Sequence, residues 1–149
     1  MTTPFPNIRT LDLQSEDPGT DDLVSRMNVF LSEFSWAKQT GNVWVARSIP
    51  GVFGLFLVEL NAVSASVDPY TWVVVGDIPP AYISTVYAAS PKEALKGYLA
   101  EMGAWVKAVE NDEAVDDLMP VNGAPTKENA EALKLRLSFL ESEILPSLN

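Results

Sequence analysis

Apolar residues recur at helical spacing near the beginning of the chain. They share one face of a helix: Leu23, Met27, Phe30, Leu31 and Phe34. This spacing predicts an amphipathic helix. Thr20 stands just before it, where threonine is a common N-cap, and acidic residues follow where the helix dipole favours them. We therefore expect the first helix to run from Thr20 to about Lys38.

Four segments in the middle of the chain are rich in β-branched and aromatic residues, which predicts strands. The segments are 43–47, 52–60, 70–75 and 81–87. Pro50-Gly51 predicts a type II turn between the first two, because proline presets φ and glycine accepts a positive φ. The short connections predict an antiparallel meander.

The C-terminal half contains two further helix patterns. Ser90-Pro91-Lys92-Glu93 places serine at the N-cap, proline at the first helical position and glutamate at the capping-box position. The apolar face that follows contains Leu95, Tyr98, Leu99, Met102, Trp105, Val106 and Val109. Gly97 and Gly103 interrupt this helix, and we expect them to allow close packing against a neighbouring backbone. Thr126 caps a last helix, which ends near Pro146.

The order α-β-β-β-β-α-α predicts an α+β fold, in which helices pack on an antiparallel meander sheet of about four strands. The chain has 149 residues, enough for one domain with a substantial core. We assign residues 20–149 to this domain. Residues 1–19 are rich in proline and polar residues and predict a loosely ordered arm.

The two most apolar strands, 52–60 and 70–75, do not alternate apolar and polar residues. A sheet with one solvated face would show that alternation. Both faces of the sheet must therefore be covered. The cover is either the three helices divided between the faces, or a second copy of the chain or another protein.

The chain has no histidine and no cysteine. Ser-His-Asp and Cys-His catalysis, thiol redox centres and zinc fingers are thereby excluded. Carboxylate, Lys, Tyr and Ser/Thr chemistry remains. We expect a protein that is not an enzyme and that uses no cofactor or metal.

The charge is acidic: 20 Asp and Glu oppose 10 Lys and Arg, for a formal charge of −10. This balance argues against binding nucleic acid, whose phosphates need clustered Lys and Arg, and against an anionic membrane surface. It serves solubility or steers a basic partner toward the protein.

No targeting signal is expected. The first six residues contain no basic region followed by an apolar one, so they do not resemble a signal peptide. The longest apolar stretch, 52–58, is much shorter than the roughly 20 residues of a membrane helix. Because disulfides are also impossible, we expect a bacterial-type cytoplasmic location.

Glu59 and Asp77 close the two most apolar strands. If these strand ends meet in a low dielectric, a protonated carboxyl becomes available as a general acid. The structural alternative, which we favour, is that Glu59 marks the exit of its strand from the core and Asp77 is a turn residue.

Several other residues are candidates for binding. Pro79 and Pro80 stiffen the segment between Asp77 and Tyr82, either for recognition or to turn a corner. Four acidic residues lie close together after the long helix of the C-terminal half: Asp112, Glu113, Asp116 and Asp117. Their spacing is not that of a calcium-binding loop. They predict either a solvated surface or a contact for a basic partner. Trp36 and Trp44 flank the Gly41-Asn42 break, where exposed tryptophan would be an interaction hot spot.

The chain resembles small bacterial single-domain proteins to which no function is assigned. The segments that carry this resemblance are 72–82, 90–95, 105–106 and 118–122. It implies no catalytic residues. In size, acidity and tryptophan content the chain is also similar to immunity proteins of toxin systems and to some secretion chaperones.

Three hypotheses follow. The first is an acidic protein–protein interaction module for a basic partner, of the immunity or chaperone type. The second is a carboxylate-based enzyme or small-ligand binder with a pocket around Glu59, Asp77 and Tyr82. The third is a structural homodimer in which sheet faces meet.

Overall fold

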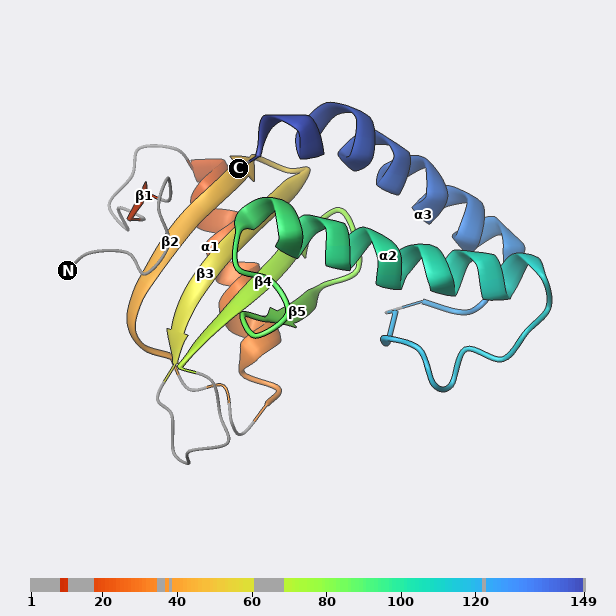
Figure 1. Cartoon of the computed structure of the whole chain (residues 1–149), viewed down its shortest axis with the longest axis horizontal. Helices are drawn as coiled ribbons and strands as arrows, with labels where there is room; N and C mark the ends of the chain where they lie inside the picture. The colour runs from red at the N-terminus through yellow and green to blue at the C-terminus, as the bar shows by residue number, and fades with distance from the viewer. Residues whose placement is uncertain are drawn as a thin grey trace.

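The computed structural model describes residues 9–10, 18–34, 37, 39–60, 69–121 and 123–148. In this part of the chain, five antiparallel strands form one sheet in the order β1-β2-β3-β4-β5 (Figure 1). The strands are β1 (Arg9–Thr10), β2 (Gln39–Ile49), β3 (Phe53–Leu60), β4 (Tyr70–Gly76) and β5 (Ala81–Ser84). Strands β2 to β5 are the predicted meander. The strand β1 comes from the segment assigned to the arm, and it pairs with β2.

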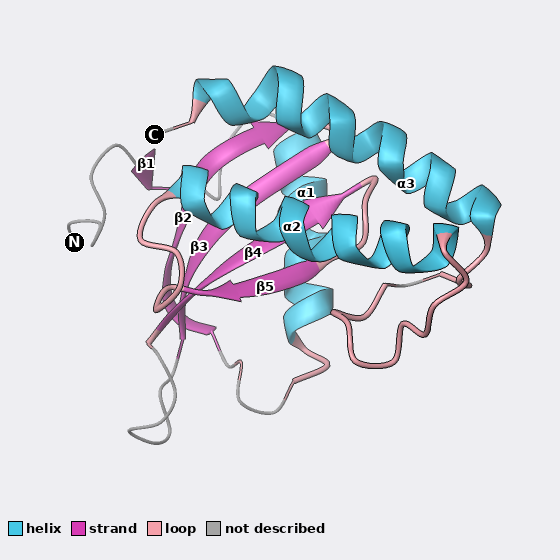
Figure 2. Cartoon of the chain, turned by 45° about the vertical axis from the view of Figure 1, so that its right-hand side comes forward, coloured by secondary structure: helices cyan, strands magenta, loops and turns pink. Residues whose placement is uncertain are grey.

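The helices cover both faces of the sheet. Helix α1 (Pro18–Leu31) packs on one face, and α2 (Pro91–Glu110) and α3 (Lys127–Phe139) lie on the other (Figure 2). A π-helical turn (Leu140–Ile144) and a 3-10 turn (Leu145–Ser147) extend α3. The α+β class and the order of its main elements are therefore confirmed.

Strands β3 and β4 are buried on both sides, as their lack of alternation predicts. One set of their side chains packs with α1: Phe56, Val58, Leu60, Val73 and Val75. The other set belongs to the core beneath α2 and α3: Phe53, Leu55, Leu57, Trp72 and Val74. The helices of one chain thus supply the cover. In the described residues, both faces of these two strands are covered within one chain.

Helix α1 differs from its predicted bounds at both ends. It begins at Pro18, because proline fits the first turn of a helix, and Thr20 is already inside it. The Thr20 side chain is buried, and its hydroxyl lies 3.0 Å from that of Ser48, so it ties the helix to β2. After Leu31 the chain tightens into a turn in which Phe34 N donates to Leu31 O.

The predicted caps of the other helices are confirmed. Ser90 Oγ accepts a hydrogen bond of 3.2 Å from Glu93 N, and Glu93 Oε2 accepts one of 2.7 Å from Ala89 N. Thr126 Oγ1 caps α3 by accepting from Asn129 N. The expectation for the two glycines of α2 is wrong. A Cβ at Gly97 would make only an ordinary contact, 3.9 Å from Ile83, and one at Gly103 would meet nothing within 4 Å.

The predicted turn between β2 and β3 is confirmed as well. Gly51 has a φ of 76°, and Val52 N donates to Ile49 O over 2.9 Å. Of the helices in the described residues, none combines the length and hydropathy that crossing a bilayer requires.

Candidate functional site: a groove at the sheet edge

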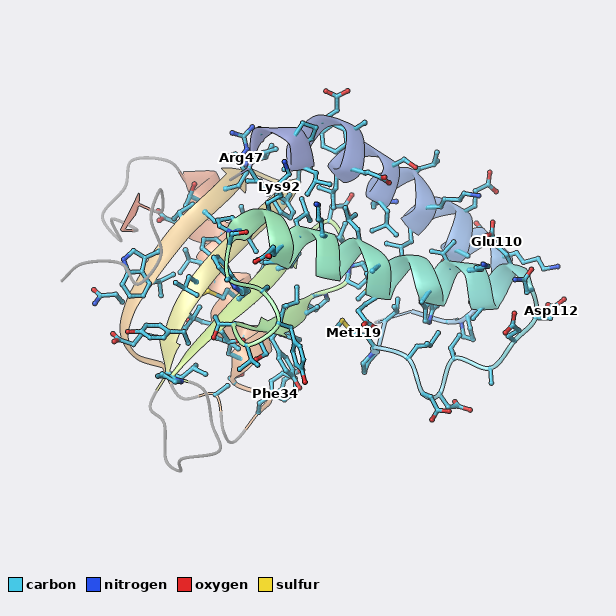
Figure 3. The ribbon with its side chains drawn as sticks, in the orientation of Figure 1. Phe34, Arg47, Lys92, Glu110, Asp112 and Met119 are labelled. Atoms are coloured by element: carbon cyan, nitrogen blue, oxygen red, sulfur yellow. The ribbon has the colours of Figure 1, made fainter. Side chains whose placement is uncertain are left out.

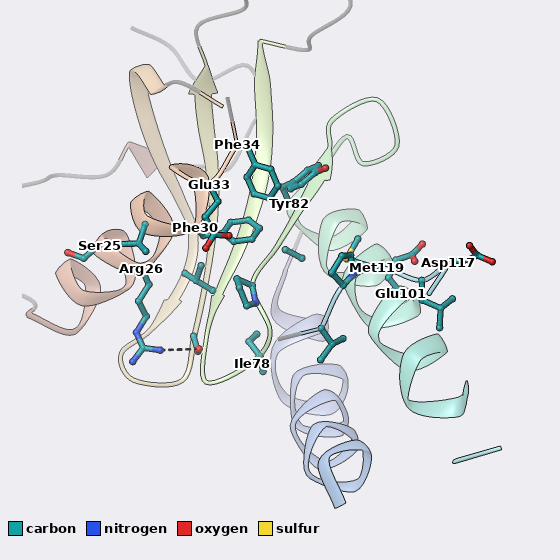
Figure 4. Close-up of a pocket in the computed structure, with 18 residues that line it drawn as sticks. Ser25, Arg26, Phe30, Glu33, Phe34, Ile78, Tyr82, Glu101, Asp117 and Met119 are labelled. Atoms are coloured by element: carbon teal, nitrogen blue, oxygen red, sulfur yellow. Dashed lines mark hydrogen bonds between the residues drawn. The ribbon is translucent and has the colours of Figure 1, made fainter. Parts of the chain in front are cut away.

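A groove of about 1160 Å³ lies along the β5 edge of the sheet (Figure 4). The second half of α1 forms one wall. The segment 117–121 and Glu101 of α2 form the opposite wall. Between the walls lie the end of β4, the connecting loop and the start of β5. The groove therefore brings together α1, the β4–β5 connection, Glu101 of α2 and the segment 117–121, which are separate in the sequence.

Three aromatic rings form the α1 wall. The ring centroids of Phe34 and Tyr82 are 5.3 Å apart at an interplanar angle of 76°, and those of Phe30 and Phe34 are 5.2 Å apart at 74°. Both are edge-to-face arrangements, which aromatic pairs prefer. Tyr82 is still 40% exposed, and Val29 on the neighbouring turn of α1 is 66% exposed. The wall therefore offers rigid apolar surface to a ligand.

The strand register places Tyr82 on this wall. Tyr82 pairs with Val73 of β4, which belongs to the core on the α1 face. Because side chains directly opposite one another lie on the same face of a sheet, Tyr82 also projects toward α1. Phe30 and Phe34 are four residues apart and meet it from the end of the helix.

The opposite wall is apolar with acidic residues beside it. Leu118, Met119 and Val121 are partly buried and pack against the core beneath α2 and α3. Met119 lies across from Phe34, and both are labelled in Figure 3. A methionine side chain adapts its shape readily to a bound surface. Glu101 and Asp117 lie beside these residues and are exposed.

Hydrogen bonds from both helix layers hold the loop between β4 and β5 in place. Arg26 Nη1 donates to Gly76 O over 3.2 Å, which ties the loop to α1. Tyr98 Oη donates to Pro79 O over 2.7 Å, which ties it to α2. Burial raises the pKa of Tyr98 well above its usual range, so the phenol stays protonated and keeps donating. The loop is thus fastened to both helix layers.

The groove carries more negative than positive charge. Of the described residues that line it, Glu33, Glu101 and Asp117 are acidic and Arg26 is basic. Arg26 is already paired with Asp22, with 3.1 Å between Nε and Oδ2. In the described part of the chain, none of the three lining acids pairs with a cation. The described lining of the groove is therefore net acidic.

The structure brings together only some of the candidates from the sequence. Pro80, Tyr82 and Asp117 line the groove, and Pro79 supports it through Tyr98. Asp77 lies next to the lining residues but is exposed and pairs with Arg136, at 3.1 Å.

The remaining candidates do not line the groove. Asp112 pairs with Lys127 over 3.8 Å, and Glu113 and Asp116 are exposed. Trp36 lies outside the described residues. The expected exposure of Trp44 is wrong: it is fully buried beneath the helices, because it faces the core on the α2 side of β2.

The proposed pair of carboxylates does not form. In the antiparallel pairing of β3 and β4, Glu59 lies opposite Tyr70, whereas Gly76, next to Asp77, lies opposite Phe53. The ends of two consecutive antiparallel strands lie at opposite ends of the pair, so Glu59 and Asp77 are separated by the full strand length. Glu59 Oε1 instead accepts a hydrogen bond from Asn42 N, at 3.0 Å. Within the described residues, no three acidic side chains are grouped so as to hold a metal ion.

The sequence analysis missed Phe30 and Phe34 as site residues, because both belong to the apolar face of a helix and were assigned to the core. Helical spacing gave no signal that separates them from the core. On a helix, Phe34 falls within the stripe formed by Leu23, Met27 and Leu31, and Phe30 falls at its margin. Met119 gave no signal either.

Comparison with known proteins finds no family model that matches this chain, and no significant match among curated proteins or solved structures.

Proposed function

We propose that this protein is a non-enzymatic binding module that docks a basic and apolar segment of a partner protein in the groove. The observation that carries the proposal is the combination of aromatic rings on one wall, of which Tyr82 is exposed and Phe30 and Phe34 are partly buried, with unpaired acids on both walls. Aromatic anchors provide binding energy in protein interfaces. Acidic residues around them select cationic partners and raise the association rate.

The open form of the groove favours a polypeptide segment over an enclosed small molecule. Its volume of about 1160 Å³ lies near the upper end of the range for small-ligand pockets, about 300 to 1,000 Å³. Its walls come from separate layers of the fold and leave it open along the edge of the sheet (Figure 4). The overall charge of −10 adds long-range attraction for a basic partner.

A role of the immunity or chaperone type, in a bacterial cytoplasm, is the form of this function that we propose. In such roles an acidic protein holds a basic segment of another protein. A carboxylate-based enzyme has less support, because the pair of carboxylates that it requires is separated by the length of a strand.

A selection from a library of random peptides, displayed on phage and captured by the full chain, tests the proposal. Peptides of about ten residues reach roughly 33 Å when extended, enough to pass through the groove. We expect the selected peptides to contain both basic and apolar residues. Their affinities are then measured by fluorescence anisotropy at about 50 mM and about 300 mM salt, where screening differs strongly.

Two charge variants distinguish the effect of the groove acids on peptide affinity from the effect of the overall charge. Glu101→Gln with Asp117→Asn removes two charges from the groove, and we expect affinity for the selected peptides to fall about fivefold at low salt. Glu131→Gln with Glu143→Gln removes the same charge from exposed positions outside the groove. This control should change affinity less than about twofold. The proposal is contradicted if both variants lose the same affinity, or if the affinities do not depend on salt concentration.

A further inference from the structure

We infer that the docked segment is an extended strand that pairs with β5 and carries alternating apolar and basic residues. This inference rests on the proposed function and names the conformation and the pattern of the partner. Adding a strand to an open sheet edge is a recurring mode of peptide recognition.

The groove coincides with the edge of the sheet. Strand β5 is last in the strand order and pairs with β4 over four positions, from Thr71↔Ser84 to Val74↔Ala81. Ala81 and Tyr82, at the start of β5, line the groove, as does Pro80 just before them. A further strand would lie about 4.8 Å beyond β5, within the space between the walls.

The two walls continue past β5 on both sides. Figure 1 shows the second half of α2, and the chain that follows it, extending beyond the β5 edge. Figure 4 shows Phe30 and Phe34 on one side of this edge, with Met119 and Glu101 on the other. A segment in the groove is therefore covered on both of its faces, as β4 is within the sheet.

The alternation of side chains along a strand then defines the pattern of the partner. On β5, Tyr82 faces the α1 layer, whereas Ala81 belongs to the core on the α2 side. An added strand alternates in the same way. Its residues on the α1 side meet the aromatic rings of Phe30 and Tyr82, with Glu33 beside them. Its residues on the other side meet Met119, Glu101 and Asp117. Because two of the three acids lie on that other side, basic residues should be concentrated at every second position.

The turn after β5 gives a second contact. Val86 and Tyr87 are 75% and 86% exposed and are not among the residues that line the groove. They follow Ser84, the last residue of β5, by two and three positions. A strand that pairs along all of β5 reaches this turn. A compact ligand held only between the walls does not.

The length of β5 limits the pairing. Edge strands that are short and carry proline resist indefinite pairing with other chains. Strand β5 has four residues, and Pro79 and Pro80 precede it. The edge is thus open to one short segment of a partner and poorly suited to pairing with a second copy.

The selected peptides provide the test. We expect N-methylation of alternate peptide residues to weaken binding about tenfold or more, because every second N–H faces β5. N-methylation of the intervening residues should be tolerated. We also expect amide hydrogen exchange in the segment 81–87 to slow about tenfold in the complex.

Tyr87 supplies a matched comparison. Tyr87 lies outside the groove. Tyr87→Thr should weaken the binding of a strand-forming peptide about fivefold, whereas it should not change the binding of a compact ligand. Selection of no peptide at all contradicts the proposed function. The strand inference is overturned if peptides bind the groove without slowing exchange in 81–87, or if their basic residues recur at helical spacing. Either result remains compatible with the proposed binding function.

Discussion

The phenol of Tyr98 on α2 donates a hydrogen bond of 2.7 Å to the carbonyl oxygen of Pro79, in the loop that leads into β5. Proline has no N–H, so this loop has few backbone donors with which to hold itself. The bond fixes the loop from the α2 side, while Arg26 fixes it from the α1 side through Gly76 O. The position of the groove therefore depends on both helix layers.

Tyr98→Phe should lower the free energy of unfolding by about 1 kcal/mol near neutral pH, because Pro79 O loses its partner. Urea unfolding of both proteins measures the difference. A variant as stable as the original protein would show that the hydrogen bond does not hold the loop.

Because of Tyr98, we also expect the free energy of unfolding to depend on pH in the alkaline range. Burial raises the pKa of Tyr98 in the folded state, whereas in the unfolded state it stays near the ordinary tyrosine value of about 10. Above that pH the unfolded state binds fewer protons than the folded state, so stability falls by up to about 1.4 kcal/mol per pH unit. Tyr98→Phe removes this titration, and the stability difference between the two proteins should shrink as pH rises above about 10. A difference that stays constant contradicts this account.

Gly76→Ala should be strongly destabilising. Gly76 has a φ of 139°, and a Cβ there would lie 2.3 Å from Val52 O. Neither the conformation nor the contact is tolerated by other residues, so we expect a loss of about 1–3 kcal/mol from the free energy of unfolding. Because Gly76 also lines the groove, the variant should bind the selected peptides more weakly at temperatures where it remains folded.

Gly103→Ala is the matched control and should have the opposite sign. Gly103 lies inside α2, and its added methyl group would meet nothing within 4 Å. Alanine in a helix interior is favoured over glycine by about 0.5–1 kcal/mol. Thermal unfolding should therefore show a higher midpoint for Gly103→Ala and a lower one for Gly76→Ala. Destabilisation by Gly103→Ala would indicate a close contact that the structure does not have.

The sequence predicted those features that depend on neighbouring residues. The cap at Ser90 and Glu93 and the turn at Gly51 are local, and both are confirmed. The cover on both sheet faces followed from β3 and β4, whose residues of both parities are apolar.

The groove depends on contacts that local patterns do not contain. Its walls join Phe34, Tyr82 and Met119, which come from three separate segments. Of these, only Tyr82 was a candidate, through the stiff segment that precedes it. A meeting of Glu59 and Asp77 was the less favoured of two interpretations, and the antiparallel direction of β3 and β4 rules it out by placing the two residues at opposite ends of the strand pair.

The affinity of a selected peptide for Tyr82→Thr tests the central claim most directly. Threonine keeps the preference for a strand but removes the ring that joins β5 to the aromatic wall. We predict binding about tenfold weaker or more by fluorescence anisotropy. Leu135→Gln, which removes an exposed apolar residue of α3 outside the groove, should leave affinity unchanged. Unchanged affinity in a folded Tyr82→Thr variant would contradict the assignment of this groove as the binding site.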